Sequence, residues 1–141
     1  MFNRKILELL NQWKNNPDRK PLILRGARQV GKTTAVKMFA EQFENYIDLN
    51  LELKADRDIF NEALSVKELF QAILVIKNIR LKTGKTLLLI DEIQNSPTAV
   101  KMLRYFYEEL KGLHVIAAGS LLEFVLEKNQ ISFPVGRVQF A

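Results

Sequence analysis

A glycine-containing stretch near the N-terminus has residue types and spacing suited to binding phosphate. Residues 25–34 are RGARQVGKTT, and residues 26–33 match the pattern G-x-x-x-x-G-K-[ST] in full. Glycine lets a loop curl until several backbone N–H groups converge, since no Cβ obstructs the approach of a ligand. Lysine adds a positive charge to this cup of donors, so the stretch predicts a site for a polyphosphate.

Positions in this loop have predicted roles toward a nucleotide. Gly26 and Gly31 allow the cup to form, and Lys32 neutralises the β and γ phosphates. The Thr33 hydroxyl is placed to bind Mg²⁺, and Thr34 is placed to contact the α-phosphate. The complete predicted nucleotide-binding set is Gly26, Ala27, Arg28, Gln29, Val30, Gly31, Lys32, Thr33 and Thr34. A second Gly-Lys-Thr, at residues 84–86, lacks the first glycine and precedes a strand, so it predicts a turn.

An apolar run that ends in two acids is the second chemical signal. Residues 87–92 are LLLIDE. Burying a carboxylate costs free energy unless it is paired or metal-bound, so acids at the end of so apolar a strand need a cation. Mg²⁺ held through Thr33 supplies one, which makes Asp91 the other predicted metal ligand. Glu92 is predicted to orient and deprotonate a water that attacks the γ-phosphate.

The loop and the acids must be positioned by secondary structure, and the hydrophobic pattern predicts strands alternating with helices. Short apolar runs bounded by turn formers are typical of buried strands, and apolar residues three and four apart are typical of helices. The alternation predicts an α/β fold with a parallel sheet and helices on both faces. Together with the motif at residues 26–33, which lies between a predicted strand and a predicted helix, this predicts a three-layer P-loop NTPase sandwich. The predicted strands are residues 22–24, 46–52 (near an edge), 86–92 and 114–120; the predicted helices are residues 6–13, 66–77, 103–110 and a segment beginning near Lys32, with residues 54–58 as a polar connection.

Composition narrows the class of protein. The chain has 141 residues, 48% of them hydrophobic and 26% charged, which is typical of one soluble globular domain. It has no cysteine and a single histidine, His114, which excludes thiolate and histidine-rich metal sites. It shows no secretory signal and no membrane-spanning run, so we expect a cytoplasmic protein with no membrane partner. The net charge of +5 is spread along the chain and indicates an anionic partner only weakly.

Three motifs together resemble one class of P-loop ATPase. GARQVGKTT at residues 26–34, LLLIDEIQ at 87–94 and AAGS at 117–120 are similar to those of the AAA-like division, in which an additional strand lies between the loop strand and the acidic strand. RGARQVGKTT, DEIQ, a Gly-Ser and a following Gly-Arg are closer still to a large, mostly uncharacterised group of bacterial and archaeal ATPases. The resemblance covers residues 22–137 and implies ATP and Mg²⁺ as cofactors.

The resemblance also implies further site residues. Ser120 takes the sensor position that contacts the γ-phosphate or the attacking water, and Gln94 and Arg137 match family positions. Arg137 is either an arginine finger, in cis or from a neighbouring subunit, or a turn residue beside its glycine. The predicted catalytic set is Glu92, Lys32, Ser120 and Arg137.

Members of this group usually continue past the Gly-Arg into a helical lid, a winged-helix-like region and a nuclease-like domain. We therefore expect residues 1–141 to be one P-loop ATPase domain, the N-terminal part of a longer protein. The region beyond it is expected to carry any DNA or protein partner, and an oligomer is compatible with the sequence. Nucleotide binding by this piece is expected to be weak and its fifth strand incomplete.

Three functions stay open at this point. The leading hypothesis is Mg²⁺-dependent ATP binding and hydrolysis that drives a motor or switch in an attached domain. The first alternative is a P-loop kinase, although such enzymes generally bring an arginine-rich lid and no such cluster occurs here. The second is a nucleotide-dependent binding module with little hydrolysis. The preference for ATP over GTP rests on the resemblance alone.

Overall fold

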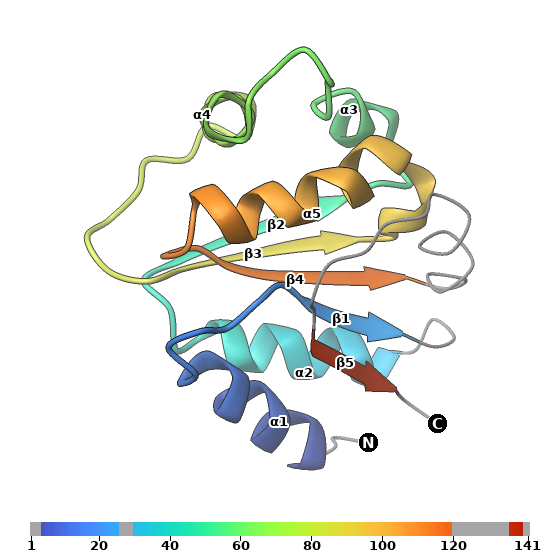
Figure 1. Ribbon diagram of the computed structural model, residues 1–141. Helices are drawn as coiled ribbons and strands as arrows, with labels where there is room; N and C mark the ends of the chain where they lie inside the picture. Colours follow the sequence, from blue (N-terminus) through green and yellow to red (C-terminus); the bar gives the residue numbers. More distant parts are fainter. Residues whose placement is uncertain (1–3, 26–29, 120–135, 140–141) are drawn as a thin grey trace.

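In the part of the chain that the structure describes, five parallel strands form one central sheet (Figure 1). The computed structural model describes residues 4–25, 30–119 and 136–139. The strands are arranged in the order β2-β3-β4-β1-β5, which confirms the predicted α/β fold. They are β1 (Leu22–Arg25), β2 (Asn45–Asn50), β3 (Thr86–Asp91), β4 (His114–Gly119) and β5 (Gly136–Gln139).

Strand β4 separates the loop strand β1 from the acidic strand β3. Ile116 of β4 pairs with Leu22 of β1 on one side and with Leu89 of β3 on the other. This is the additional strand that the resemblance implied. The alternating strand β2 lies at one edge of the sheet, as predicted, and β5 lies at the other edge and pairs with β1 along its whole length.

Helices cover both faces of the sheet (Figure 1). Helices α1 (Arg4–Lys14) and α2 (Val30–Ala40) pack on one face. Helices α4 (Val66–Ile76) and α5 (Pro97–Glu109) pack on the other. The short helix α3 (Lys54–Arg57) follows β2, and the 3-10 turn η1 (Ile93–Asn95) follows β3. Within the described ranges, no helix is long and apolar enough to cross a membrane.

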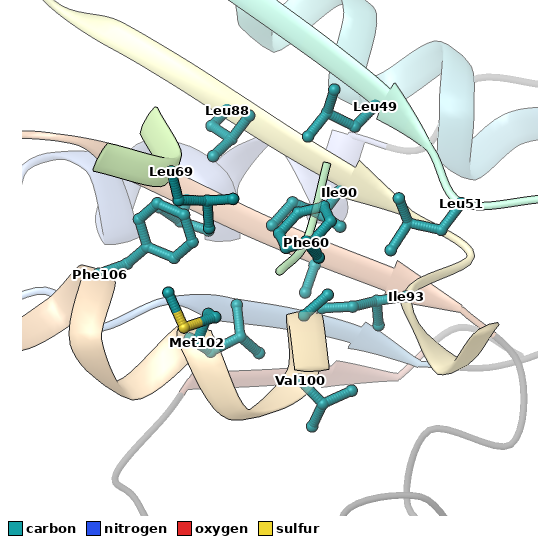
Figure 2. Packing of buried hydrophobic residues seen from close by; sticks show 14 of the residues in the cluster. Leu49, Leu51, Phe60, Leu69, Leu88, Ile90, Ile93, Val100, Met102 and Phe106 are labelled. Atoms are coloured by element: carbon teal, nitrogen blue, oxygen red, sulfur yellow. The ribbon is translucent and has the colours of Figure 1, made fainter. Parts of the chain in front are cut away.

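Strand β3 is buried on both of its faces, which explains its uninterrupted apolar sequence. Leu87 and Leu89 belong to the core cluster under α1 and α2, whereas Leu88 and Ile90 belong to the cluster under α4 and α5. Figure 2 shows Leu88 and Ile90 packed among side chains such as Phe106 in this second cluster. The period-two alternation of the strand therefore assigns each of its side chains to one layer.

The helices of the second layer begin at capping residues. The Ser65 hydroxyl accepts a hydrogen bond from the Glu68 N–H at 3.1 Å, and the Glu68 carboxylate accepts one from the Ser65 N–H at 2.9 Å. This reciprocal capping box starts α4. Ser96 caps α5 by accepting from the Ala99 N–H, and Pro97 takes the first turn, where its missing N–H costs nothing.

The second Gly-Lys-Thr forms a turn, as its sequence context predicted. Gly84 has a φ of +135°, and a Cβ there would collide with the Glu44 side chain. The Glu44 carboxylate accepts a hydrogen bond from the Lys85 N–H at 2.7 Å, and Thr86 then begins β3. Only glycine fits both the backbone conformation and the space at this turn.

Several local features differ from the sequence prediction. Helix α2 begins at Val30, earlier than the expected start near Lys32. The predicted polar connection at residues 54–58 contains helix α3, and its Asp56 is buried. Leu9 and Met38, expected on buried stripes, are 44% and 42% exposed, because their helices pack through adjacent residues.

A buried ion pair ties α3 to the end of α4. Lys77 Nζ lies 2.7 Å from Asp56 Oδ1, and Asp56 Oδ2 accepts a hydrogen bond from the Asn50 N–H at 2.9 Å. The Asp56 side chain is only 5% exposed. The pair therefore holds α3 and α4 to the carboxyl end of β2.

Replacing Lys77 with alanine is expected to lower the free energy of unfolding by about 3 kcal/mol, because it leaves the Asp56 carboxylate buried without its cation. Urea unfolding of the two proteins measures the loss. The matched control is Lys54→Ala, which removes the exposed pair between Lys54 and Asp58 and should cost less than about 1 kcal/mol. If Lys77→Ala and Lys54→Ala lose the same free energy of unfolding, the pair between Lys77 and Asp56 contributes no more to stability than the exposed pair.

The single histidine is buried at the amino end of β4. The His114 ring contacts Trp13 and Phe43 edge-on, with ring centroids 5.7 and 4.9 Å away. Arg19 Nη2 lies 3.3 Å from Nδ1, and because a guanidinium can only donate, Nδ1 acts as an acceptor in the neutral ring. Burial, followed by the Arg19 charge, lowers the pKa of His114 to about 4. The residue is therefore structural.

The buried histidine predicts a loss of stability in acid. Its folded pKa of about 4 lies below its ordinary value of 6.5, so the unfolded chain binds the proton first. The stabilisation is complete above about pH 6.5 and is lost as pH falls toward 4, by up to about 3 kcal/mol. Unfolding of wild type and His114→Phe should be compared across this range, since carboxylates titrate equally in both. Parallel pH profiles would contradict the prediction.

Candidate nucleotide site

Strands β1, β3 and β4 all end at the carboxyl-terminal edge of the sheet (Figure 1). Asp91, Glu92 and the first residues of α2 lie at or beside these strand ends, whereas Arg137 lies near the amino end of β5. Arg25, the last residue of β1, pairs with Gly119, the last residue of β4. Ile90 of β3 pairs with Ala117, so Asp91 extends one residue further toward the same edge. With β4 between them, β1 and β3 lie about 10 Å apart at this edge, a spacing that a nucleotide's phosphates and a cation can span.

Helix α2 presents its N-terminus at this edge. It begins at Val30, and only the four residues 26–29 connect it to Arg25, the last residue of β1. Gly31, Lys32 and Thr33 belong to the first turn of the helix. The first N–H groups of a helix have no partner within it, and the helix dipole makes this end attractive to an anion.

Asp91 lies on the face of the sheet that α2 covers. Along β3, Leu87 and Leu89 pack against α2 and its neighbour α1, so the alternation places Asp91 on that same face. Its Oδ1 accepts a hydrogen bond from the Glu92 N–H at 2.9 Å. The carboxylate predicted to bind the metal and the helix predicted to bind phosphate thus share one edge and one face.

Negative charge accumulates beside Asp91. Desolvation raises the pKa of Asp48, and the Asp91 charge raises it further, while Lys37 of α2 opposes the shift. Asn50 of β2 pairs with Asp91, and Asp48 lies two residues before Asn50. Residues two apart on a strand point to the same face, so Asp48 and Asp91 lie on one face of the sheet. Carboxylates that repel one another favour a cation among them, and oxygen ligands are those that Mg²⁺ prefers. Asp91 is therefore an oxygen ligand of the kind that Mg²⁺ prefers, and the described residues contain no group of three or more acidic or histidine side chains that would hold a metal ion by themselves.

Glu92 has a different environment from Asp91. Its backbone is left-handed, with φ 54° and ψ 43°, and the residue is only 7% exposed. This conformation costs a non-glycine residue about 1–2 kcal/mol, so the surrounding structure must maintain it. The side-chain amide of Gln94 donates a hydrogen bond from Nε2 to Glu92 Oε1 at 2.8 Å. The turn after β3 therefore gives its two acids separate partners.

Gln94 also reaches the end of β4. A Cβ on Gly119 would overlap Gln94 Oε1 and come 3.4 Å from the Ile93 nitrogen. The motif resemblance implies Gln94 only as a family position, and no local signal in the sequence links it to Gly119. The contact between them appears only when β3 and β4 are side by side.

Some predicted residues lie outside what the structure describes. Residues 26–29 and Ser120 are not among the described residues, nor are the side chains of Lys32 and Thr33. The backbone of Arg137 is described. It lies in β5 and pairs with Ile23 of β1, two residues before Gln139, which pairs with Arg25 at the carboxyl end of β1. The predicted roles of these residues remain predictions.

The comparisons with known proteins agree with this architecture. Residues 18–141 match the family model described as an AAA domain. The chain belongs to this family. The match confirms the AAA-like P-loop class that the motifs resemble, while the narrower bacterial and archaeal group stays a prediction. No curated protein matches the sequence at a significant level.

Two solved structures share the fold of this AAA domain. The Orc1 protein of Aeropyrum pernix, solved in complex with DNA, superposes with a TM-score of 0.60 at 17% identity. PCH-2 of C. elegans superposes with a TM-score of 0.55 at 13% identity. The matches cover 98% and 99% of this chain but 44% of each of those chains. The AAA domain thus spans less than half the length of the structures it resembles.

Proposed function

We propose that this AAA domain binds ATP with Mg²⁺ and hydrolyses it at the carboxyl edge of its sheet. The observation that carries the proposal is the shared position of Asp91 and the N-terminus of α2, on one edge and one face of the sheet. A helix N-terminus that binds phosphate and a carboxylate that binds the metal can act on the same nucleotide only if both lie beside its phosphates.

In this proposal the loop residues bind the phosphates. Gly26 to Thr34 surround the phosphate chain with backbone N–H groups, and Lys32 adds its charge at the β and γ phosphates. Thr33 and Asp91 hold Mg²⁺, which when bound neutralises charge on the phosphate oxygens. Asp48 strengthens the local negative charge that attracts the cation.

Hydrolysis requires a base beside the γ-phosphate, and Glu92 is the proposed one. It takes a proton from water as the water oxygen bonds to the γ-phosphorus, while the bond from that phosphorus to the β–γ bridging oxygen breaks. The products are ADP and inorganic phosphate. Ser120 contacts the γ-phosphate or the water, and Arg137 stabilises the developing charge, in cis or from another subunit.

We further propose that hydrolysis changes the conformation of an attached region and so drives a motor or a switch. The matched structures are more than twice as long as the part that resembles this chain, and one of them was solved with DNA. Because this chain matches only 44% of each of those chains, a further region that binds a DNA or protein partner is compatible with the comparison.

Binding of a fluorescent ATP analogue and release of phosphate, each with and without Mg²⁺, test the proposal. We expect saturable binding, and phosphate release that stops when EDTA removes the cation. Release without any added acceptor separates hydrolysis from the kinase alternative, and a parallel titration with GTP tests the base preference. Absence of Mg²⁺-dependent binding of either nucleotide would refute the assignment of the site.

A further inference from the structure

The side chain of Gln94 connects Glu92 to the last residue of β4. At one end its Nε2 donates to Glu92 Oε1 at 2.8 Å. At the other end its Oε1 lies against Gly119, where a side chain would overlap it. Both neighbours are buried. One amide group therefore contacts the proposed base and the strand end that leads into Ser120.

The amide is held at a cost that its packing alone does not explain. Gln94 Oε1 is buried and has no hydrogen-bond partner among the residues the structure describes. A buried carbonyl oxygen without a partner is unfavourable, and an apolar side chain of similar size would avoid the penalty. The amide donor to Glu92 is the feature that an apolar side chain would lack.

The contact with Gly119 restricts how the amide can rotate. If the end of β4 shifts, Gln94 Oε1 either loses its neighbour or is pushed by it, and Nε2 on the same planar group moves with it. Glu92, in its left-handed turn, accepts from that nitrogen. The orientation of the Glu92 carboxylate thus depends on the position of a strand end one strand away.

We infer that Gln94 is a positioning residue that sets the orientation of the Glu92 carboxylate according to the position of Gly119 at the end of β4. The inference rests on the proposed function insofar as Glu92 is the base.

Steady-state kinetics test this role through the split between binding and turnover. Gln94→Ala is expected to lower kcat for phosphate release about 10- to 100-fold, as expected for a misplaced general base, with nucleotide affinity unchanged within about twofold. The control is Asn95→Ala, an exposed neighbour in the same 3-10 turn, which should leave kcat unchanged. The inference would be overturned if Gln94→Ala kept the wild-type kcat, or if its kcat and its affinity for nucleotide fell by the same factor.

A double-mutant cycle tests the connection to β4. Gly119→Ala places a Cβ where Gln94 Oε1 lies, so we expect it to lower kcat as Gln94→Ala does. In the Gln94→Ala background that space is vacant, and adding Gly119→Ala should cost little more. If the two losses multiply instead, Gly119 does not act through Gln94. Thermal unfolding of each variant shows whether it is folded.

A measurement without nucleotide separates this inference from the proposed function. In the ¹⁵N-labelled wild-type protein, the Gln94 side-chain amide should exchange slowly with solvent because its nitrogen is hydrogen-bonded to Glu92 and its oxygen is buried. Gly119→Ala should shift that resonance and speed its exchange, whereas Asn95→Ala should do neither. An unchanged Gln94 resonance in Gly119→Ala would refute the coupling even if ATP is hydrolysed. If the Gln94 resonance shifts in Gly119→Ala but the protein binds no nucleotide, the coupling stands and only the proposed function is refuted.

Discussion

Replacing Glu92 with glutamine is expected to lower the rate of phosphate release by about 10² to 10⁴-fold, the contribution typical of a general base. Glutamine has nearly the same size as glutamate and keeps an oxygen that can accept the hydrogen bond from Gln94 Nε2. The buried turn should therefore keep its shape. What the variant loses is the carboxylate that takes the proton from water.

Nucleotide binding separates this effect from a general loss of structure. The affinity of Glu92→Gln for the ATP analogue should stay within about threefold of wild type, because the proposed base contacts water and not the phosphate-binding loop. Single-turnover phosphate release and equilibrium binding are the two measurements. Wild-type turnover in this variant would favour the alternative of a nucleotide-dependent binding module with little hydrolysis.

Replacing Lys32 with alanine should weaken ATP binding by about 2–4 kcal/mol, on the order of 30- to 1000-fold, since removing one partner of a close charge pair commonly costs this much. Lys32 lies in the first turn of α2, so its backbone N–H and the helix dipole stay in place in the variant. The lost affinity would report the ammonium group alone. Fluorescence titration in the presence of Mg²⁺ measures it.

The sequence contains its own control for this lysine. Lys85 has the same immediate neighbours, glycine before it and threonine after it, but lies in the turn that leads into β3. Lys85→Ala should bind ATP as wild type does. If Lys32→Ala also binds normally, the phosphate-binding loop has been assigned to the wrong residues.

Local pattern determined most of the fold and the general location of the site. A short apolar run must be buried on both faces of a sheet, so residues 87–90 predicted β3 without reference to the rest of the chain. The glycine and lysine spacing of residues 26–33 likewise predicts a phosphate-binding loop between a strand and a helix, and β1 and α2 flank it. The strand and helix assignments are confirmed because periodicity and glycine placement act over a few residues, while phosphate binding by residues 26–33 stays a prediction.

Asp56 and His114 show where local pattern was insufficient. Asp56 looked like part of a polar connection, yet it is buried because Lys77 and the Asn50 N–H hold its carboxylate. His114 has a lowered pKa because Trp13, Phe43 and Arg19 surround it from other parts of the chain. In both cases at least one side chain that determines the burial comes from a distant part of the sequence: Lys77 for Asp56, and Trp13, Phe43 and Arg19 for His114.

The sequence by itself determined which residues have the chemistry for a nucleotide and which strands and helices must present them. Only the tertiary structure decided that Asp91 shares the face of α2, that Glu92 adopts a left-handed turn, and that Gln94 touches Gly119. The physical reason is that hydrophobic period and loop chemistry depend on near neighbours. Contacts between adjacent strands depend on their order and register, which no local pattern specifies.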